Sequence, residues 1–203
     1  MIGQPVDSQT VGVVLAGGQS RRMRVDKATL RWRTTDGDTI TWLEHSQRRL
    51  QSVCTSVAVS GPALDALPDQ YADHQGPLAG IATALAHFPN QRCVFLPVDM
   101  PWVTPAALNN LCRLSTAHGL FQTSLFPILL TADAEAQQCV QQLLTHPERS
   151  QRSLRSLFSQ LPAATVTQLT ADDPKRMRNV NHPADLGTEL FTLNHSLLEH
   201  VHS

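Results

Sequence analysis

A short apolar run followed by two adjacent glycines restricts the fold of this chain more than any other feature. The run Val11-Gly-Val-Val-Leu15 is rich in β-branched residues, and Gly17 and Gly18 follow it. This pattern is typical of a buried parallel strand that leads into a loop. A glycine has no Cβ, so the backbone N–H groups of such a loop can come close to phosphate oxygens. Paired glycines also mark ordinary tight turns, and the glycines alone leave both interpretations open.

The rest of the chain alternates between strand-like and helix-like patterns. We expect strands at 28–32, 55–59, 93–98, 124–130 and 164–167, and helices at 41–50, 76–88, 104–114, 133–144, 150–161 and 183–201. Thr104 and Asp133 are the expected N-caps of two of these helices. The alternation predicts an α/β protein, a single-domain three-layer α/β/α sandwich over residues 1–203 with a mostly parallel, Rossmann-like sheet. Residues 1–10 are expected to form a flexible N-terminus.

Asp99 is the acidic residue whose position points most directly to chemistry. It follows the apolar strand 93–98 and precedes Met100 and Pro101, so we expect it at the carboxyl end of a strand, where ligands bind in parallel sheets. A carboxylate there can hold Mg²⁺ against nucleotide phosphates, although an acid that only caps a turn is the alternative. The glycine loop favours the metal, because Ser20, Arg22 and Lys27 add donors for the same phosphates.

Composition limits the other classes of function. The net charge is −1, with 41% hydrophobic and 16% charged residues, which provides no basic surface for nucleic acid. The sequence shows no run of about 18 apolar residues that would cross a membrane. Four cysteines lie far apart without the close pairs of zinc or redox motifs. We therefore expect a cytoplasmic protein that binds neither nucleic acid nor membranes.

Four blocks of sequence together resemble one known family. They are Leu-Ala-Gly-Gly-x-Ser-x-Arg-Met-x-x-Asp-Lys over 15–27, Asp69 followed by Gly-Pro-Leu-Ala-Gly over 76–80, Pro-Val-Asp-Met-Pro over 97–101, and Asn-Val-Asn-x-Pro-x-Asp-Leu over 179–186. In this order they resemble the signature motifs of the molybdenum cofactor guanylyltransferases, which are MobA-like nucleotidyltransferases. The loop is neither a Walker sequence nor the Gly-x-Gly-x-x-Gly of dinucleotide-binding folds.

The resemblance implies a fold of the nucleotide-diphospho-sugar transferase type and a defined reaction. GMP would pass from GTP to the phosphate of molybdopterin, forming molybdopterin guanine dinucleotide and releasing pyrophosphate, with Mg²⁺ as the metal. GTP and molybdopterin would be the small-molecule partners, and proteins that deliver or accept the molybdenum cofactor are further possible partners. A related nucleotidyltransferase that uses CTP or a sugar phosphate, or a non-catalytic nucleotide-binding paralogue, remains the alternative.

The same resemblance implies roles for individual residues. Arg22, Lys27 and Asp99 would be catalytic, with Asp99 as the metal ligand. The residues that would bind the two substrates are Leu15, Ala16, Gly17, Gly18, Ser20, Lys27, Asp69, Gly76, Pro77, Gly80, Asn179 and Asn181. Among them, the first loop would cradle the phosphates, the 76–80 block would frame the guanine with Leu15, and the two asparagines would lie on the pterin side.

Three departures from the family pattern keep the alternatives open. Arg24 stands where the family has glycine, and Ser60 stands where it commonly has asparagine. An arginine at a position that needs positive φ would be strained. The stretch 115–124 is also shorter than in the family, and it contributes to the acceptor side there.

Overall fold

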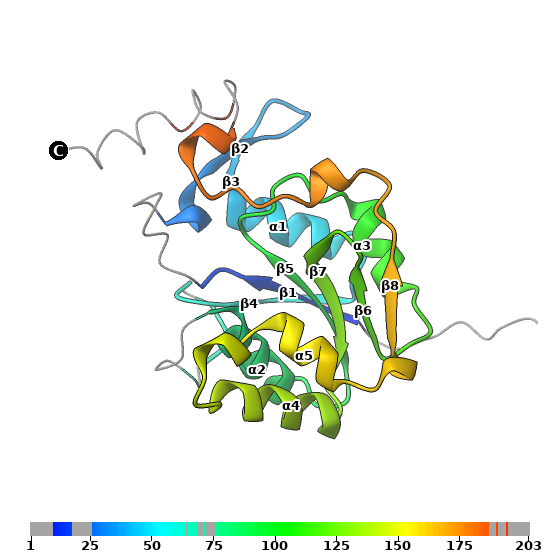
Figure 1. Ribbon diagram of the computed structural model, residues 1–203. Coiled ribbons are helices and arrows are strands. Elements are labelled where there is room, and N and C mark those ends of the chain that lie inside the picture. The colour runs from blue at the N-terminus through cyan, green and yellow to red at the C-terminus, as the bar shows by residue number, and fades with distance from the viewer. Residues whose placement is uncertain are drawn as a thin grey trace, which may run out of the picture.

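The computed structural model describes residues 10–17, 26–63, 65–68, 71, 76–186, 190 and 194. Its centre is a six-stranded sheet with the strand order β4-β1-β5-β7-β6-β8 (Figure 1). The strands are β1 (Thr10–Leu15), β4 (Ser56–Ser60), β5 (Arg92–Pro97), β6 (His118–Phe121), β7 (Ser124–Thr131) and β8 (Val166–Leu169). A separate two-stranded ribbon contains β2 (Arg31–Arg33) and β3 (Thr39–Thr41).

The sheet is mostly parallel, as the sequence predicts. β1 pairs in parallel with both β4 and β5, and β6 pairs in parallel with β8. Only β7 runs against its neighbours, because it pairs antiparallel with β5 and β6. The carboxyl ends of β4, β1 and β5 therefore meet at one edge.

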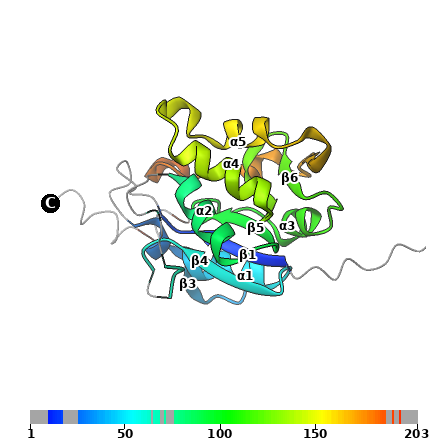
Figure 2. The same cartoon turned by 90° about the horizontal axis from the view of Figure 1, so that it is seen from below.

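Helices cover both faces of this sheet. They are α1 (Trp42–Gln51), α2 (Pro77–His87), α3 (Pro105–Cys112), α4 (Ala134–Leu144) and α5 (Leu154–Gln160). Figures 1 and 2 show α1 and α3 on one face and α2, α4 and α5 on the other. This arrangement confirms the expected three-layer α/β/α class. None of the helices in the described part of the chain has the length and hydropathy of a membrane span.

Local sequence signals explain where the helices begin. Thr41 accepts a hydrogen bond from the backbone N–H of Glu44, whose side chain accepts one from Thr41 in return, and this capping box starts α1. Thr104 and Asp133 cap α3 and α4 through the amides of Ala107 and Ala136. The two N-caps expected from the sequence are thus confirmed.

Three expected boundaries were wrong, each because a 3-10 turn replaces part of the element. The 28–32 strand begins only at Arg31, since Asp26 caps the 3-10 turn η1 (Lys27–Thr29). The 164–167 strand begins at Val166, after η3 (Ala163–Thr165). The 150–161 helix is divided into η2 (Arg149–Gln151) and α5. The chain also forms β6 within the 115–124 stretch, where we expected no strand.

The C-terminal part of the described chain crosses the sheet as short turns. They are η4 (Pro174–Met177), which contacts β7, and η5 (Pro183–Leu186), which appears in dark orange beside the β2–β3 ribbon in Figure 1. The expected helix over 183–201 therefore begins as a 3-10 turn. Apart from Leu190 and Asn194, the rest of that range lies outside the described residues.

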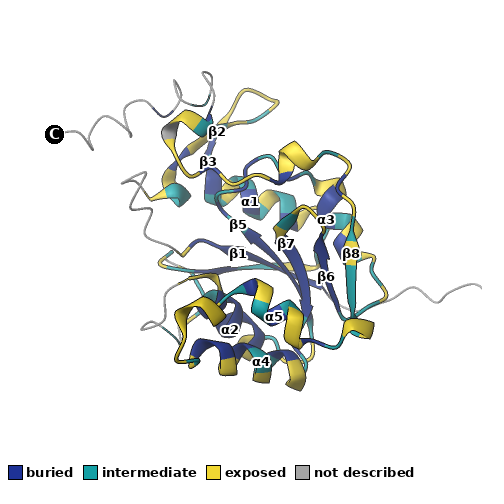
Figure 3. Cartoon of the chain, in the orientation of Figure 1, coloured by how far each residue is buried: buried dark blue, intermediate teal, exposed yellow. Residues whose placement is uncertain are grey.

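The hydrophobic core lies along the central strands. All six residues of β1 are buried, and Figure 3 shows β1, β5 and β7 as largely buried between helices whose outer sides are exposed. A Cβ at Gly12 would lie 2.7 Å from Leu50 Cβ, so this glycine lets α1 approach β1 closely. This packing fixes α1 against the strand that leads into the glycine loop.

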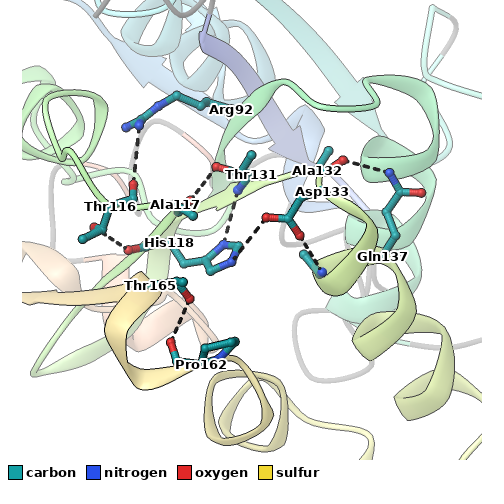
Figure 4. Close-up of polar contacts among 11 residues, drawn as sticks. Arg92, Thr116, Ala117, His118, Thr131, Ala132, Asp133, Gln137, Pro162 and Thr165 are labelled. Carbon is teal, nitrogen blue, oxygen red and sulfur yellow. Dashed lines mark hydrogen bonds and ion pairs between the residues drawn. The ribbon is translucent and has the colours of Figure 1, made fainter.

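A polar cluster stabilises the end of the sheet where β5 and β6 begin, which is opposite the carboxyl ends of the parallel strands (Figure 4). Arg92 is buried and donates hydrogen bonds to the backbone carbonyls of Cys112, Leu114 and Thr116. Nearby, the buried His118 accepts from the Thr131 amide through Nδ1 at 3.4 Å. These side chains satisfy backbone groups far from the carboxyl ends, so the cluster is structural.

Candidate functional site

The site lies where the carboxyl ends of three parallel strands meet. Leu15 at the end of β1 is paired with Ser60 of β4 on one side and Pro97 of β5 on the other. The backbone then continues in register, because the Ala16 amide donates to the Ser60 carbonyl at 2.8 Å and the Val98 amide to the Leu15 carbonyl at 3.1 Å. The glycine loop and the turn that contains Asp99 thus start side by side.

A network of four polar side chains occupies this edge. Lys27 Nζ lies 2.9 Å from Asp99 Oδ2 and 3.2 Å from Asn181 Oδ1. Asn179 Nδ2 donates to the other carboxylate oxygen, Asp99 Oδ1, at 3.1 Å. The side chains of Lys27 and Asp99 are 12% and 17% exposed, so the ion pair is largely shielded from water yet reachable from outside.

The backbone of the Asn-Val-Asn segment is tied to the same turn. The Val180 amide donates to the Asp99 carbonyl at 2.8 Å. Asp185 then accepts from the amides of Asn181 and His182, both at 2.8 Å, and these two hydrogen bonds lower the pKa of the Asp185 carboxyl. The segment is therefore held in place on both sides of its asparagines.

The start of the glycine loop is packed against a second glycine. Gly61 has a φ of +144°, and a Cβ there would lie 2.6 Å from the Gly17 nitrogen and 2.8 Å from the Ala16 carbonyl carbon. Only a residue without a side chain allows this close approach. We did not single out Gly61 from the sequence. The signal in the sequence that could have identified Gly61 is its position between the end of a strand and Pro62.

The 76–80 block lies beside Leu15, as the resemblance implies. A Cβ at Gly80 would lie 3.0 Å from Leu15 Cδ2 and 2.9 Å from Ser60 Oγ, so the first turn of α2 packs directly onto the ends of β1 and β4. Gly76 is the N-cap of α2 with a φ of +103°, and Pro77 follows as the first helical residue. Gly80 thus has a packing role here, in addition to the guanine contact expected for it.

Several residues expected to contribute lie outside the described residues. They are Gly18, Ser20, Arg22 and Asp69, together with the departure from the family pattern, Arg24. Of the residues expected to bind or to catalyse, the structure brings together Lys27, Asp99, Asn179 and Asn181 in one network. The direct ion pair between Lys27 and Asp99 was not foreseen.

Two residues of α1 also contact the turn that contains Asp99. His45 Nε2 donates to the Pro101 carbonyl at 3.2 Å, and the Arg49 guanidinium donates to the carbonyls of Met100 and Pro101. Burial, together with the nearby Arg49 charge, lowers the pKa of His45 to about 4, so the ring is neutral at pH 7. Sequence reasoning missed both residues because backbone carbonyls occur at every position and carry no sequence signal.

An arginine stacks on an indole at the rim of the same site. The Arg178 guanidinium lies 4.3 Å from the ring centroid of Trp102, a favourable cation–π distance. Arg178 directly precedes Asn179, and Trp102 lies three residues after Asp99. This contact adds a third connection between the two segments that frame the carboxylate.

The oxygen atoms at this edge fit a divalent cation that shares its coordination with a substrate. Mg²⁺ in nucleotide sites is held by one or two carboxylates together with phosphates and water, all of them oxygen ligands. Asp99 supplies a carboxylate and Asn181 an amide oxygen, and both now bind the positively charged Lys27 ammonium. Within the described ranges there is no cluster of three or more His, Cys, Asp and Glu side chains.

The fold and the site together define a three-layer α/β protein with a polar candidate ligand site at the carboxyl ends of its central parallel strands. Comparison with known proteins gives the particular family. The sequence profile of the MobA-like NTP transferase domain matches residues 12–165, and the chain belongs to this family.

Curated relatives and solved structures agree with this assignment. The chain is 36% identical over 177 residues to a molybdenum cofactor guanylyltransferase from Xanthomonas euvesicatoria pv. vesicatoria, covering 85% of this chain and 89% of the relative. It is 33% identical to a probable molybdenum cofactor guanylyltransferase from Rhodopirellula baltica, covering 87% and 90%. The fold is similar to that of molybdopterin-guanine dinucleotide biosynthesis protein A from Archaeoglobus fulgidus, with a TM-score of 0.65, 17% identity and coverage of 93% and 99%.

Proposed function

We propose that this protein transfers GMP from GTP to the phosphate of molybdopterin, forming molybdopterin guanine dinucleotide and pyrophosphate. The single observation that supports the proposal best is the network of Lys27, Asp99, Asn179 and Asn181 at the carboxyl ends of the central strands. Relatives named as molybdenum cofactor guanylyltransferases cover most of the chain, which supports the choice of donor and acceptor.

The reaction needs no nucleophile from the protein. A phosphate oxygen of molybdopterin attacks the α-phosphorus of GTP, a new P–O bond forms, and the bond to the β-phosphate bridging oxygen breaks as pyrophosphate leaves. Catalysis then depends on alignment of the two phosphates and on neutralisation of their charge. These are tasks for fixed donors and cations.

Lys27 is the cation best placed for this neutralisation. In the network its ammonium is bonded to two oxygen atoms, Asp99 Oδ2 and Asn181 Oδ1. When triphosphate binds, the ammonium turns toward the phosphate oxygens, and Arg22 offsets the remaining charge. Asp99 and Asn181 would hold Mg²⁺ through their side-chain oxygen atoms, and the ion would supply further neutralisation of the phosphate charge.

The remaining roles follow the resemblance to the family. The loop with Ala16, Gly17, Gly18 and Ser20 binds the phosphates through its amides, and Asp69 contacts the nucleotide. Leu15, Gly76, Pro77 and Gly80 frame the guanine. Asn179 and Asn181 bind the acceptor, since an amide both donates and accepts hydrogen bonds.

A cytoplasmic location is part of the same proposal, and so is contact with proteins that deliver or accept the cofactor. All four cysteines are free thiols, which suits a reducing compartment.

One assay tests the proposed reaction. The purified protein is incubated with Mg²⁺, molybdopterin and either GTP, ATP or CTP, and pyrophosphate and dinucleotide are measured. We expect turnover with GTP only. Turnover with CTP alone would move the protein to the cytidylyl enzymes, and nucleotide binding without pyrophosphate would make it a non-catalytic paralogue.

Substitution of the metal-binding carboxylate tests the assignment of Asp99. Asp99→Asn keeps the side-chain size but removes the negative charge, so we expect Mg²⁺-dependent turnover to fall by about 100-fold or more. Full activity in this variant would show that Asp99 does not hold the metal.

A further inference from the structure

Three consecutive backbone carbonyls of the Asp99 turn are held by donors from other elements. The Asp99 carbonyl accepts from the Val180 amide at 2.8 Å. The Met100 carbonyl accepts from Arg49 Nη1 at 3.4 Å. The Pro101 carbonyl accepts from Arg49 Nη2 and from His45 Nε2, the latter at 3.2 Å. The turn is thus held both by the C-terminal segment and by α1.

The two donors on α1 are themselves fixed. His45 stacks on Trp32 of β2 with ring centroids 4.2 Å apart and an angle of 18° between the planes. The Arg49 guanidinium lies 5.7 Å from the centroid of the same indole. His45 and Arg49 are four residues apart, which places them on one face of the helix. A stacked, partly buried donor pair loses little freedom when it binds the turn.

These contacts reach the backbone next to Asp99 and not its carboxylate. The carboxylate oxygens accept from Lys27 and Asn179. The Met100 and Pro101 carbonyls belong to the two peptides that follow the Asp99–Met100 peptide. Hydrogen bonds to these carbonyls therefore limit how far the backbone at Asp99, and with it the carboxylate, can shift. A displacement of about 1 Å at a reacting site costs on the order of 100-fold in rate.

We infer that His45 and Arg49 are positioning residues for the transfer reaction, which orient the Asp99 carboxylate by holding the carbonyls of Met100 and Pro101. Both residues act on the backbone of the turn. The inference rests on the proposed function, because it takes Asp99 as the carboxylate that serves the phosphates.

Two pairs of variants separate positioning from simple stabilisation. Arg49→Met removes both donated hydrogen bonds, whereas Arg49→Lys keeps the charge and one donor. His45→Leu removes the hydrogen bond and the stacking, whereas His45→Gln keeps an amide donor near the Pro101 carbonyl. Arg48→Met is the matched control, because Arg48 is the exposed neighbour on the same helix.

The expected result is a fall in kcat with little change in the KM for GTP. We expect Arg49→Met to lower kcat by about 10- to 100-fold, with Arg49→Lys recovering part of the loss and His45→Gln recovering more than His45→Leu. The control should match the wild type. Mn²⁺ binding in the presence of GTP, measured by EPR titration, should weaken in Arg49→Met in the same direction as in Asp99→Asn.

Other results would overturn the inference. If kcat falls only in proportion to the fraction of protein that is folded, the two residues have a structural role. The same holds if KM rises while kcat is unchanged. A wild-type protein that releases no pyrophosphate would overturn the proposed function instead. The Mn²⁺ titration then decides the inference alone, and equal Mn²⁺ affinity in wild type and Arg49→Met, including no binding in either, would reject it.

Discussion

At the residue scale, the Lys27 and Asp99 side chains lie in direct contact although they are 72 positions apart in the chain. Each neutralises the charge of the other at a site that is largely shielded from water. Burial of a charge without a partner is costly, so this pairing stabilises both charged side chains. It also keeps a cation ready beside the position where phosphates are proposed to bind.

The role of this cation can be tested with a matched pair of lysines. Lys27→Met should lower kcat for pyrophosphate release by about 100- to 1,000-fold, since loss of one charge-stabilising donor costs on the order of 3–4 kcal/mol in a transition state. Lys175 is the other lysine of the chain and is exposed, so Lys175→Met should behave as wild type. Equal activity of both variants would exclude Lys27 from catalysis.

Substitutions at two glycines with positive φ, Gly37 and Gly61, distinguish the cost of backbone strain from the cost of a steric clash. A Cβ at Gly37 (φ +91°) would meet nothing within 4 Å, whereas one at Gly61 (φ +144°) would lie 2.6 Å from the Gly17 nitrogen. Gly37→Ala should cost about 1–2 kcal/mol of unfolding free energy, and Gly61→Ala should cost more because it also displaces the glycine loop. Urea unfolding of both variants measures the difference, and equal losses would show that the packing at Gly61 is unimportant.

At the element scale, side-chain caps fix where the helices start. Thr41, Thr104, Asp133 and Ser153 each accept a hydrogen bond from an amide in the first turn of the helix that follows. Because the cap at Thr41 fixes the start of α1, it also fixes the positions along the helix from which His45 and Arg49 reach the Asp99 turn. Capping is a local interaction, and the sequence already indicated it for α3 and α4.

The cap of α4 gives a test at this scale. Asp133→Ala removes the acceptor for the Ala136 amide and should lower the free energy of unfolding by about 1 kcal/mol. Asp133→Asn keeps a good N-cap and should lose less than half of that amount. Urea denaturation at pH 8, where His118 is neutral, measures the two variants. If the asparagine variant lost as much as the alanine variant, the charge and not the cap would be the stabilising feature.

At the scale of the whole molecule, the site is assembled from segments that are remote in sequence. Asn181 and Asn179 return to Lys27 and Asp99 over separations of 154 and 80 residues. The C-terminal segment therefore completes the edge that β1 and β5 begin. The polar cluster of Arg92 and His118 lies at the other end of the sheet, so stability and chemistry are located at opposite ends.

Global stability should depend on two histidines, the buried His118 and the half-buried His45. Burial lowers the pKa of His118, although Asp133 raises it slightly, and burial lowers the pKa of His45 to about 4. The unfolded chain then binds more protons than the folded one below about pH 6.5, so stability is complete above that pH and falls as the pH drops. We expect a loss on the order of 2 kcal/mol between pH 7.5 and 5.

Urea unfolding as a function of pH measures this loss. His118→Gln and His45→Gln should each reduce the slope between pH 7.5 and 5. A slope that stays unchanged when both histidines are replaced would attribute the pH dependence to other groups.

The sequence alone determined the layered α/β class, the strand before the glycine loop, the caps at Thr104 and Asp133, and the position of Asp99 at a strand end. Each depends on interactions between near neighbours, which leave a periodic or local signal. Only the tertiary structure decided the pairing of Lys27 with Asp99, the close approach at Gly61 and the contact of His45 and Arg49 with the turn. Those contacts join distant segments, and several end on backbone carbonyls, which are the same at every residue and therefore leave no signal in the sequence.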